Sequence, residues 1–138
     1  MNVIIDTNII LSAIIKDSLT RHLIISSNIL FYYPEQSFDE VLRNKKIVLE
    51  KTKMPQEEFN TKLITLFKYI NVIKNEELLG YAEEADKIIG HIHKNDVPFI
   101  AAALAKHAII WSNDQHFQKQ DKIRVITTND IINYKKLV

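Results

Sequence analysis

Four acidic side chains stand at positions where a folded α/β chain would bring them together. Asp6 closes the apolar run of residues 3–5, and Asp114 follows a second apolar run later in the chain. Asp96 begins a segment with a strong helix-start signal, and Glu40 lies early in another helical segment. Ligands of parallel sheets bind outside the carboxyl ends of the strands, where such residues gather. The four positions therefore predict one shared acidic site.

Carboxylates gathered in this way call for a metal ion. Two of them about 5 Å apart repel by roughly 3 kcal/mol at an effective dielectric near 20. Several together protonate or separate unless a cation shares them. The sequence contains no cysteine, and a site made of oxygen ligands favours Mg²⁺ or Mn²⁺. Such a site suits phosphoryl chemistry, in which a metal-activated water attacks and a metal stabilises the leaving oxygen.

Each acid taken singly has a simpler interpretation. Asp6 and Asp96 suit the caps of helices. Asp114 lies in a Ser-Asn-Asp sequence that is typical of turns, and Glu40 would be ordinary as an exposed helix acid. The functional interpretation depends on the joint placement of all four.

The elements that must position these acids follow from the apolar pattern. Residues 2–6 form an unbroken β-branched run, which is typical of a strand covered on both faces. Further strands are expected at 29–33, 72–73, 108–111 and 124–127. Helices are expected at 7–14, 18–26, 36–51, 56–69, 76–92 and 99–106, with a short one at 116–119 and a closing one from 128 to about 136. Strands that alternate with helices predict a three-layer α/β/α sandwich with a central, mostly parallel sheet.

Two of the expected helices carry a defined inward face. In the helix at 36–51 we expect four residues to face the core: Phe38, Val41, Leu42 and Leu49. In the helix at 76–92 the expected apolar stripe consists of Leu79, Ala82, Ala85, Ile88 and Ile89. These faces set which charged neighbours point toward the sheet.

Composition restricts the class of protein. The chain has 138 residues, 46% of them hydrophobic and 25% charged, with a formal net charge of +1. These values are typical of one globular domain, here residues 1–138, and are less basic than those of a sequence-blind DNA-coating protein. No apolar stretch approaches the roughly 20 residues that cross a bilayer. No basic leader precedes the first apolar run, and the lack of cysteine fits a reducing compartment. We expect a soluble cytoplasmic protein with no membrane association.

Four segments resemble the PIN domain family in the family's order and usual spacing. They read VIIDTNIILSAI, SFDEVL, NDVPFIAAALA and IIWSNDQHF, and the resemblance extends over essentially the whole chain. It implies a three-layer fold and Mg²⁺- or Mn²⁺-dependent endoribonuclease activity. Many members are toxin halves of toxin–antitoxin pairs of the VapC type and are often dimeric. The resemblance therefore implies RNA as substrate, an antitoxin protein as partner and a homodimer.

Carried over by position, the resemblance assigns the acids as metal-binding and catalytic residues. Asp6, Glu40, Asp96 and Asp114 match the four acids in order. Asn8 matches a polar residue that supports the site by hydrogen bonding, and Ser112 matches the small hydroxyl residue of the last turn.

The chain departs from the family pattern at one site position and leaves a second open. Relatives often carry an Asp where this chain has His93, which either lowers metal affinity or reflects an outer position. This departure favours the alternative of a catalytically weak or inactive PIN module that binds RNA or protein. Asp39 lies beside Glu40 and is its rival for the second acid, although inward-facing Val41 and Leu42 favour Glu40.

Cationic and histidine side chains offer contacts to substrate. Arg43 and Lys46 follow Glu40 and are candidates for binding RNA phosphates, the alternative being a solvated helix face. His116 is a candidate to contact substrate or to protonate a leaving group, and otherwise a loop histidine.

Two other kinds of site are disfavoured. Zinc is disfavoured because His91 and His93 are two residues apart on a helix, where they face apart, and no cysteine assists. A phosphatase or phosphoacceptor domain would need a phosphate-cradling glycine-rich loop, and both glycines, Gly80 and Gly90, fall in a helical region.

Overall fold

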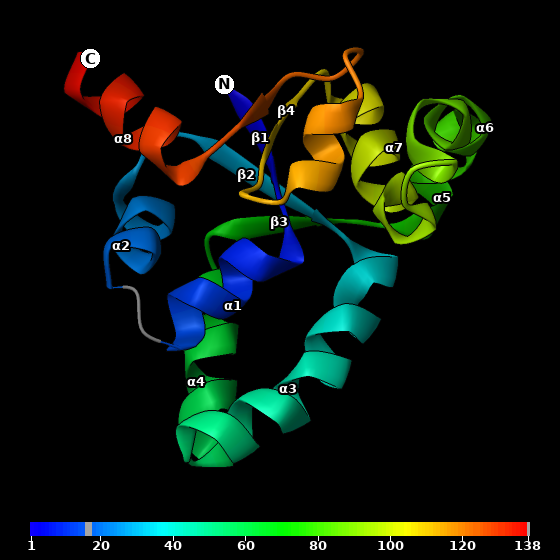
Figure 1. Ribbon diagram of the computed structural model, residues 1–138. Coiled ribbons are helices and arrows are strands. Elements are labelled where there is room, and N and C mark those ends of the chain that lie inside the picture. The colour runs from blue at the N-terminus through cyan, green and yellow to red at the C-terminus, as the bar shows by residue number, and fades with distance from the viewer. Residues whose placement is uncertain (16–17, 138) are drawn as a thin grey trace.

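The computed structural model describes residues 1–15 and 18–137 (Figure 1). The strands are β1 Asn2–Ile5, β2 Leu30–Pro34, β3 Ile70–Ile73, β4 Ile109–Trp111 and β5 Val125–Ile126. The α-helices are α1 Thr7–Ile15, α2 Ser18–Ser26, α3 Phe38–Thr52, α4 Gln56–Phe67, α5 Asn75–Leu78, α6 Ala82–Ala85, α7 Val97–Lys106 and α8 Thr128–Leu137. Short 3₁₀ or π segments are η1 Glu35–Ser37, η2 Leu79–Tyr81, η3 Asp86–Gly90, η4 Lys94–Asp96 and η5 Gln115–Lys119. No described helix is both long and apolar enough to span a bilayer.

The five strands form one sheet in the order β3-β2-β1-β4-β5, and every pair is parallel. The chain moves outward from β1 to β2 and β3 and then returns to the other side of β1 for β4 and β5. Right-handed crossovers in opposite directions place their helices on opposite faces of a sheet. Figure 1 accordingly shows α1, α3 and α4 on one side and α7 on the other. The predicted α/β/α architecture is confirmed, with a sheet that is entirely parallel.

The core lies on both faces of the central strand. Val3, Ile4 and Ile5 are fully buried, as expected for a strand between two helical layers. On the α7 side, three consecutive alanines, residues 101–103, are buried, and their small side chains let the helix approach the sheet closely. The central strand is therefore held from both faces, and its carboxyl end has a fixed position.

The expected helix at 76–92 is interrupted, and its predicted stripe was partly wrong. The segment is divided into α5, η2, α6 and η3. Leu79 is 74% exposed and Leu78 is buried in its place, whereas Ala85 and Ile89 are buried as predicted. Gly80 lies at the interruption, and glycine weakens a helix interior by about 1 kcal/mol relative to alanine. Ala82 is also exposed, and Ile88 is half-buried. At 100° per residue, Leu78 and not Leu79 lies on the same side of a helix as Ala85 and Ile89, so the predicted stripe was out of phase at Leu79.

The predicted inward face of α3 was wrong at Leu42. Leu42 is 60% exposed, whereas Val41 and Val48 are buried. Successive residues lie 100° apart around a helix, so a core-facing stripe centred on Val41 and Val48 leaves Leu42 outside it. Leu42 therefore gives no reason to prefer Glu40 over Asp39, and the choice depends on the burial of the acids themselves.

Candidate functional site

The site lies where the direction of the chain through the sheet reverses. β1 and β4 are neighbours, although one begins the first crossover and the other follows the return across the sheet. Ligands of open α/β sheets bind at such a switch point, outside the carboxyl ends of the strands. Asp6 directly follows β1, and its backbone N–H donates to the Trp111 carbonyl oxygen over 3.1 Å. This bond extends the ladder by one residue and fixes Asp6 at the reversal.

A buried serine connects Asp6 to Asp114. The Ser112 hydroxyl donates to Asp6 Oδ2 over 2.7 Å and accepts the backbone N–H of Asp114 over 2.9 Å. The Ser112 backbone N–H donates to the Ile126 carbonyl oxygen over 3.0 Å, which anchors the turn to β5. We call Asp6, Ser112 and Asp114 the Ser112 bridge. Each carboxylate in it has a position set by strand pairing.

The turn interpretation of Asp114 is correct, and it is compatible with a site role. Asp114 precedes η5, and its Oδ1 accepts the backbone N–H of His116 over 2.9 Å. The side chain thus caps η5 while it remains only half-buried. Capping fixes the rotamer of a carboxylate that still faces the other acids.

A second hydrogen-bond chain positions the helix that carries Glu40. The Tyr33 hydroxyl donates to the Ser37 carbonyl oxygen over 2.8 Å and lies 2.7 Å from Thr7 Oγ1. Because the single phenolic hydrogen is used on Ser37, the Thr7 hydroxyl is the donor to Tyr33. The residue after Asp6 is thereby tied to η1, the segment that leads into α3. Glu40 is half-buried.

Burial and mutual repulsion raise the pKa values of the acids. Burial raises the pKa of Asp6 to about 6; the Ser112 hydrogen bond opposes this, and the charges of Asp96 and Asp114 add to it. Burial likewise raises the pKa of Glu40 to about 7, and the charges of Asp6 and Asp96 add to it. Each acid feels at least one other, so the four carboxylates share one negative field. Charge effects therefore connect the four predicted acids, whereas among the described residues the ligand atoms that lie within 4.8 Å of one another belong to His93, Asp96 and His116.

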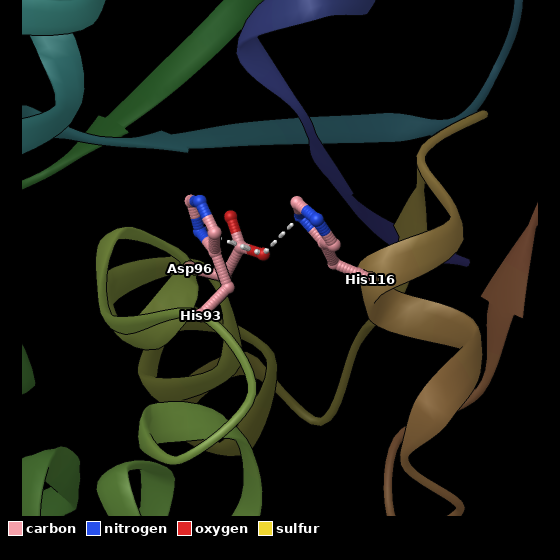
Figure 2. Close-up of side chains that lie close together, drawn as sticks. All are labelled: His93, Asp96 and His116. Carbon is pink, nitrogen blue, oxygen red and sulfur yellow. Dashed lines mark ion pairs between the residues drawn. The ribbon is translucent and has the colours of Figure 1, made fainter.

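The predicted cap role of Asp96 was wrong. Asp96 occupies the position before α7, but its side chain makes no capping hydrogen bond. Its Oδ2 instead lies 3.3 Å from His93 Nδ1 and 3.7 Å from His116 Nδ1. Figure 2 shows the two imidazoles beside this carboxylate, and their rings stack with centroids 4.4 Å apart. We call His93, Asp96 and His116 the histidine cluster.

The charges around Asp96 act in opposite directions. Burial raises the pKa of Asp96 above its ordinary value, and His93 and His116 oppose this while Asp114 adds to it. Asp96 is 6% exposed, and its Oδ2 is buried without a hydrogen-bond partner in the described part of the chain. Buried acids that repel one another, together with a carboxylate oxygen whose contacts are ion pairs to two histidines, fit the binding of a divalent cation.

The family follows from the sequence match. The PIN domain family matches residues 4–132, which extend from β1 into α8. The chain belongs to the PIN domain family. This confirms the resemblance carried by the four sequence segments. PIN domains are typically nucleases and typically bind divalent metals.

Solved structures show the same fold. The chain is similar to one in the crystal structure of VapBC2 from Rickettsia felis bound to a DNA fragment from their promoter. The two share 19% sequence identity with a TM-score of 0.69, over 92% of this chain and 98% of that chain. No curated protein matches the sequence significantly. The structural likeness therefore establishes the fold.

Three other residues predicted for this PIN domain site lie outside the acidic cluster. Asn8 is exposed, and its side chain makes no hydrogen bond that the described residues record, so its supporting role stays a prediction. Arg43 is exposed but close enough to lower the pKa of Glu40, and with Glu40 it lines a cleft of about 470 Å³. Lys46 is exposed one turn further along α3. The roles of Arg43 and Lys46 in binding RNA phosphates stay predictions.

The pairing of His93 with His116 was missed from the sequence. The zinc interpretation compared His93 with His91, which is exposed and takes no part in the cluster. His93 instead stacks on a histidine that follows in the chain after the whole of α7 and β4. The available signals were the spacings of His93 three residues before Asp96 and of His116 two residues after Asp114.

Proposed function

We propose that this PIN domain protein is a Mg²⁺- or Mn²⁺-dependent endoribonuclease that hydrolyses phosphodiester bonds in RNA. The observation that carries the proposal is the convergence of Asp6, Glu40, Asp96 and Asp114 in one partly buried negative field. Such a field has an unfavourable self-energy that a hard divalent cation relieves.

The roles of the residues follow from their geometry. Asp6, Glu40, Asp96 and Asp114 would hold the ion through carboxylate oxygens. When bound, a divalent cation supplies activation of the attacking water and stabilisation of the charge on the leaving oxygen. Ser112 donates to Asp6 Oδ2 and so fixes the orientation of the Asp6 carboxylate.

Cationic side chains near Glu40 suit an RNA backbone. Arg43 and Lys94 line the same cleft as Glu40, and Lys46 lies one helical turn after Arg43. Phosphate contacts from Arg and Lys supply most of the sequence-independent affinity for nucleic acid. We assign this cleft as the entry of the substrate backbone. His116 lies within ion-pair distance of Asp96 and Asp114, so its expected contact with substrate remains a prediction.

The biological role that we propose is the toxin component of a toxin–antitoxin pair. The VapC-type sequence segments and the likeness to VapBC2 support it. An antitoxin would be a separate chain, and a second copy of this chain would form a homodimer. Exposed apolar side chains such as Leu42 and Ile64 offer surface for either partner. Co-expression with the product of the adjacent reading frame, followed by light scattering of the purified material, tests both.

The test of the activity is cleavage of labelled RNA by the purified chain. We expect cleavage with Mg²⁺ or Mn²⁺, none with EDTA, and none by an Asp114→Asn variant. Asparagine keeps an oxygen that can accept the His116 N–H and removes the charge, so the turn should survive. Asp121→Asn, at an exposed acid, is the matched control. Intact tRNA, rRNA and mRNA after incubation with the metal-loaded wild type would refute the proposal.

A paired substitution tests the assignment of the second acid. Glu40 is half-buried and its neighbour Asp39 is exposed. We expect Glu40→Gln to lower cleavage by about 10-fold or more, as the loss of a group that supports a metal site does. Asp39→Asn should leave the rate within about twofold, because surface substitutions have small effects. The reverse order would assign the role to Asp39.

The second candidate function is a PIN module that binds RNA without cutting it. His93 beside Asp96, in place of an acid, is the observation that favours it. This candidate predicts RNA retention without cleavage, unchanged by Asp114→Asn.

A further inference from the structure

The histidine cluster brings ligand atoms of two chemical types to one point. His93 directly precedes η4, Asp96 ends η4 and His116 lies in η5. One ligand atom from each of the three lies within 4.8 Å of the others. Both Nδ1 atoms approach the same oxygen, Asp96 Oδ2, as Figure 2 shows. The arrangement joins two segments that are separated in the chain by α7 and β4.

These two approaches are ion-pair contacts that do not reach the geometry of a full hydrogen bond. His93 Nδ1, Asp96 Oδ2 and His116 Nδ1 are each buried and have no hydrogen-bond partner within the described ranges. More than nine in ten buried polar groups in proteins have such a partner. Here three buried polar atoms that lack a hydrogen-bond partner face a common point. A cation bound at that point would satisfy all three together.

The separations fit a shared ion. Ligand atoms that bind one transition-metal ion at about 2.0–2.2 Å lie roughly 2.8–3.6 Å apart in octahedral or tetrahedral geometry. The two separations from Asp96 Oδ2, 3.3 Å to His93 Nδ1 and 3.7 Å to His116 Nδ1, are near this range. Because an imidazole nitrogen binds a metal in the plane of its ring, the two rings would have to turn out of their stacked arrangement to share one ion. The partial exposure of both side chains, 38% and 39%, leaves room for this movement.

We propose that His93, Asp96 and His116 form a site for a borderline divalent transition-metal ion, of the Zn²⁺ or Co²⁺ type, that discriminates against Mg²⁺. Two imidazoles with one carboxylate are the ligands of known zinc and non-haem iron sites, whereas Mg²⁺ takes oxygen ligands and waters. This inference extends the proposed nuclease function. Metal binding by the histidine cluster does not depend on that function, whereas any effect of the ion on RNA cleavage does. Because Asp96 is shared, an ion in the histidine cluster sits at the edge where RNA would be cut.

Asp114 is placed to complete the set. Its Oδ1 lies 3.3 Å from His116 Nδ1 while it accepts the backbone N–H of His116. A fourth oxygen at this position would bring the bound ion close to the Ser112 bridge. The three-ligand site does not depend on it.

The test is direct metal binding by the whole chain, after removal of metals with EDTA and gel filtration. We expect one Co²⁺ per chain, with visible absorption bands characteristic of nitrogen ligands, and displacement by Zn²⁺ at lower concentration than by Mg²⁺, by a factor of at least about 100. Co²⁺ and Zn²⁺ alone are the probes. The measurement requires no RNA.

Three variants locate the bound ion. His93→Asn and His116→Asn should each weaken Co²⁺ binding about 10-fold or more and remove the nitrogen bands. His91→Asn, at the exposed histidine two residues before His93, should bind as the wild type does. Both cluster histidines are partly exposed, so the variants should fold, as circular dichroism will verify. If one of the two cluster variants does not fold, the other alone is sufficient for the test.

Several outcomes overturn the proposal: no Co²⁺ binding, binding that survives both substitutions, or Mg²⁺ binding as tight as that of Zn²⁺. The absence of Co²⁺ binding is the result expected if the two histidines serve only as counter-ions to Asp96. Failure of this inference is distinct from failure of the nuclease. Mg²⁺-dependent cleavage without Co²⁺ binding would refute only the histidine site, and Co²⁺ binding without RNA cleavage would refute only the nuclease.

Discussion

The Ser112 bridge and the histidine cluster lie at the same edge of the sheet but are held in different ways. In the bridge, hydrogen bonds of 2.7 and 2.9 Å connect Ser112 to Asp6 and to the Asp114 backbone. In the cluster, the ligand atoms stand 3.3 and 3.7 Å apart and make no hydrogen bonds that the described residues record. The first region is complete by itself. The second has the form of a site that is completed by something bound.

The difference separates a part of this edge that strand pairing holds rigid from a part that the proposed ion would complete. The bridge follows directly from strands β1 and β4, whose backbone pairing sets its geometry. The cluster depends on two short 3₁₀ segments, η4 and η5, which carry side chains past the sheet. Substituting residues in either region should therefore have separable effects.

The largest expected effect comes from Asp6→Asn. We expect RNA cleavage to fall by about 100-fold or more, since even outer-shell partners of metal ligands are worth 10- to 100-fold. Co²⁺ binding by the histidine cluster should change far less, because Asp6 is not one of its three ligands. Cleavage rates and Co²⁺ titrations on the same preparation measure both. Equal loss of both properties would show that the two regions are one site.

Ser112→Ala tests the rigidity of the bridge. It leaves a buried Asp6 oxygen without its donor, and we expect a loss of about 1–3 kcal/mol in the free energy of unfolding. Cleavage should fall by roughly 10- to 100-fold through misplacement of Asp6. Ser37→Ala is the matched control, because Ser37 is also buried and its Oγ has no partner in the described structure. Denaturant unfolding should separate the two; equal stability would contradict the bridge.

Raised acid pKa values predict a pH-dependent stability of the metal-free protein. Asp6 and Glu40 have pKa values of about 6 and about 7, above their ordinary 3.8 and 4.5. The folded state therefore binds more protons than the unfolded state between about pH 4 and 7, and the free energy of unfolding falls as pH rises through that window.

The measurement is the melting temperature in EDTA between pH 4 and 8. A change of 1 kcal/mol moves Tm by roughly 2–8 °C in domains of this size range. Asp6→Asn should flatten the decline, and added Mn²⁺ should restore stability at pH 8 by binding the folded state. A Tm in EDTA that rises steadily across the window would show that the acids are not the dominant titrating groups.

The smallest expected effect comes from Tyr33→Phe. It removes the hydroxyl that donates to the Ser37 carbonyl oxygen and accepts from Thr7. We expect a loss of about 1 kcal/mol in the free energy of unfolding, the usual value of a hydrogen bond. Cleavage should drop modestly through Glu40, while Co²⁺ binding stays unchanged. Tyr32→Phe on the same strand is the control. Equal effects of the two substitutions would show that the Thr7–Tyr33–Ser37 hydrogen bonds do not position Glu40.

Much of the fold could be predicted because its signals are local. Unbroken apolar runs marked the strands, and the alternation with helices implied a parallel sheet, which the strand order confirmed. The errors came where local patterns compete. Leu79 and Leu78 are equally apolar, and the helical phase set by Ala85 and Ile89 places Leu78 in the core. Leu42 likewise satisfied the composition of an inward face but not its helical phase.

The sequence by itself determined the family and the class of fold, because both depend on short segments and on their order. It also singled out the four acids, whose roles stay predictions. Only the tertiary structure decided which histidines meet. His93 and His116 are separated by α7 and β4, and their stacking depends on where the crossover returns η5 beside η4. A contact of that kind has no local signal, since its energy arises only after the chain has closed a long loop.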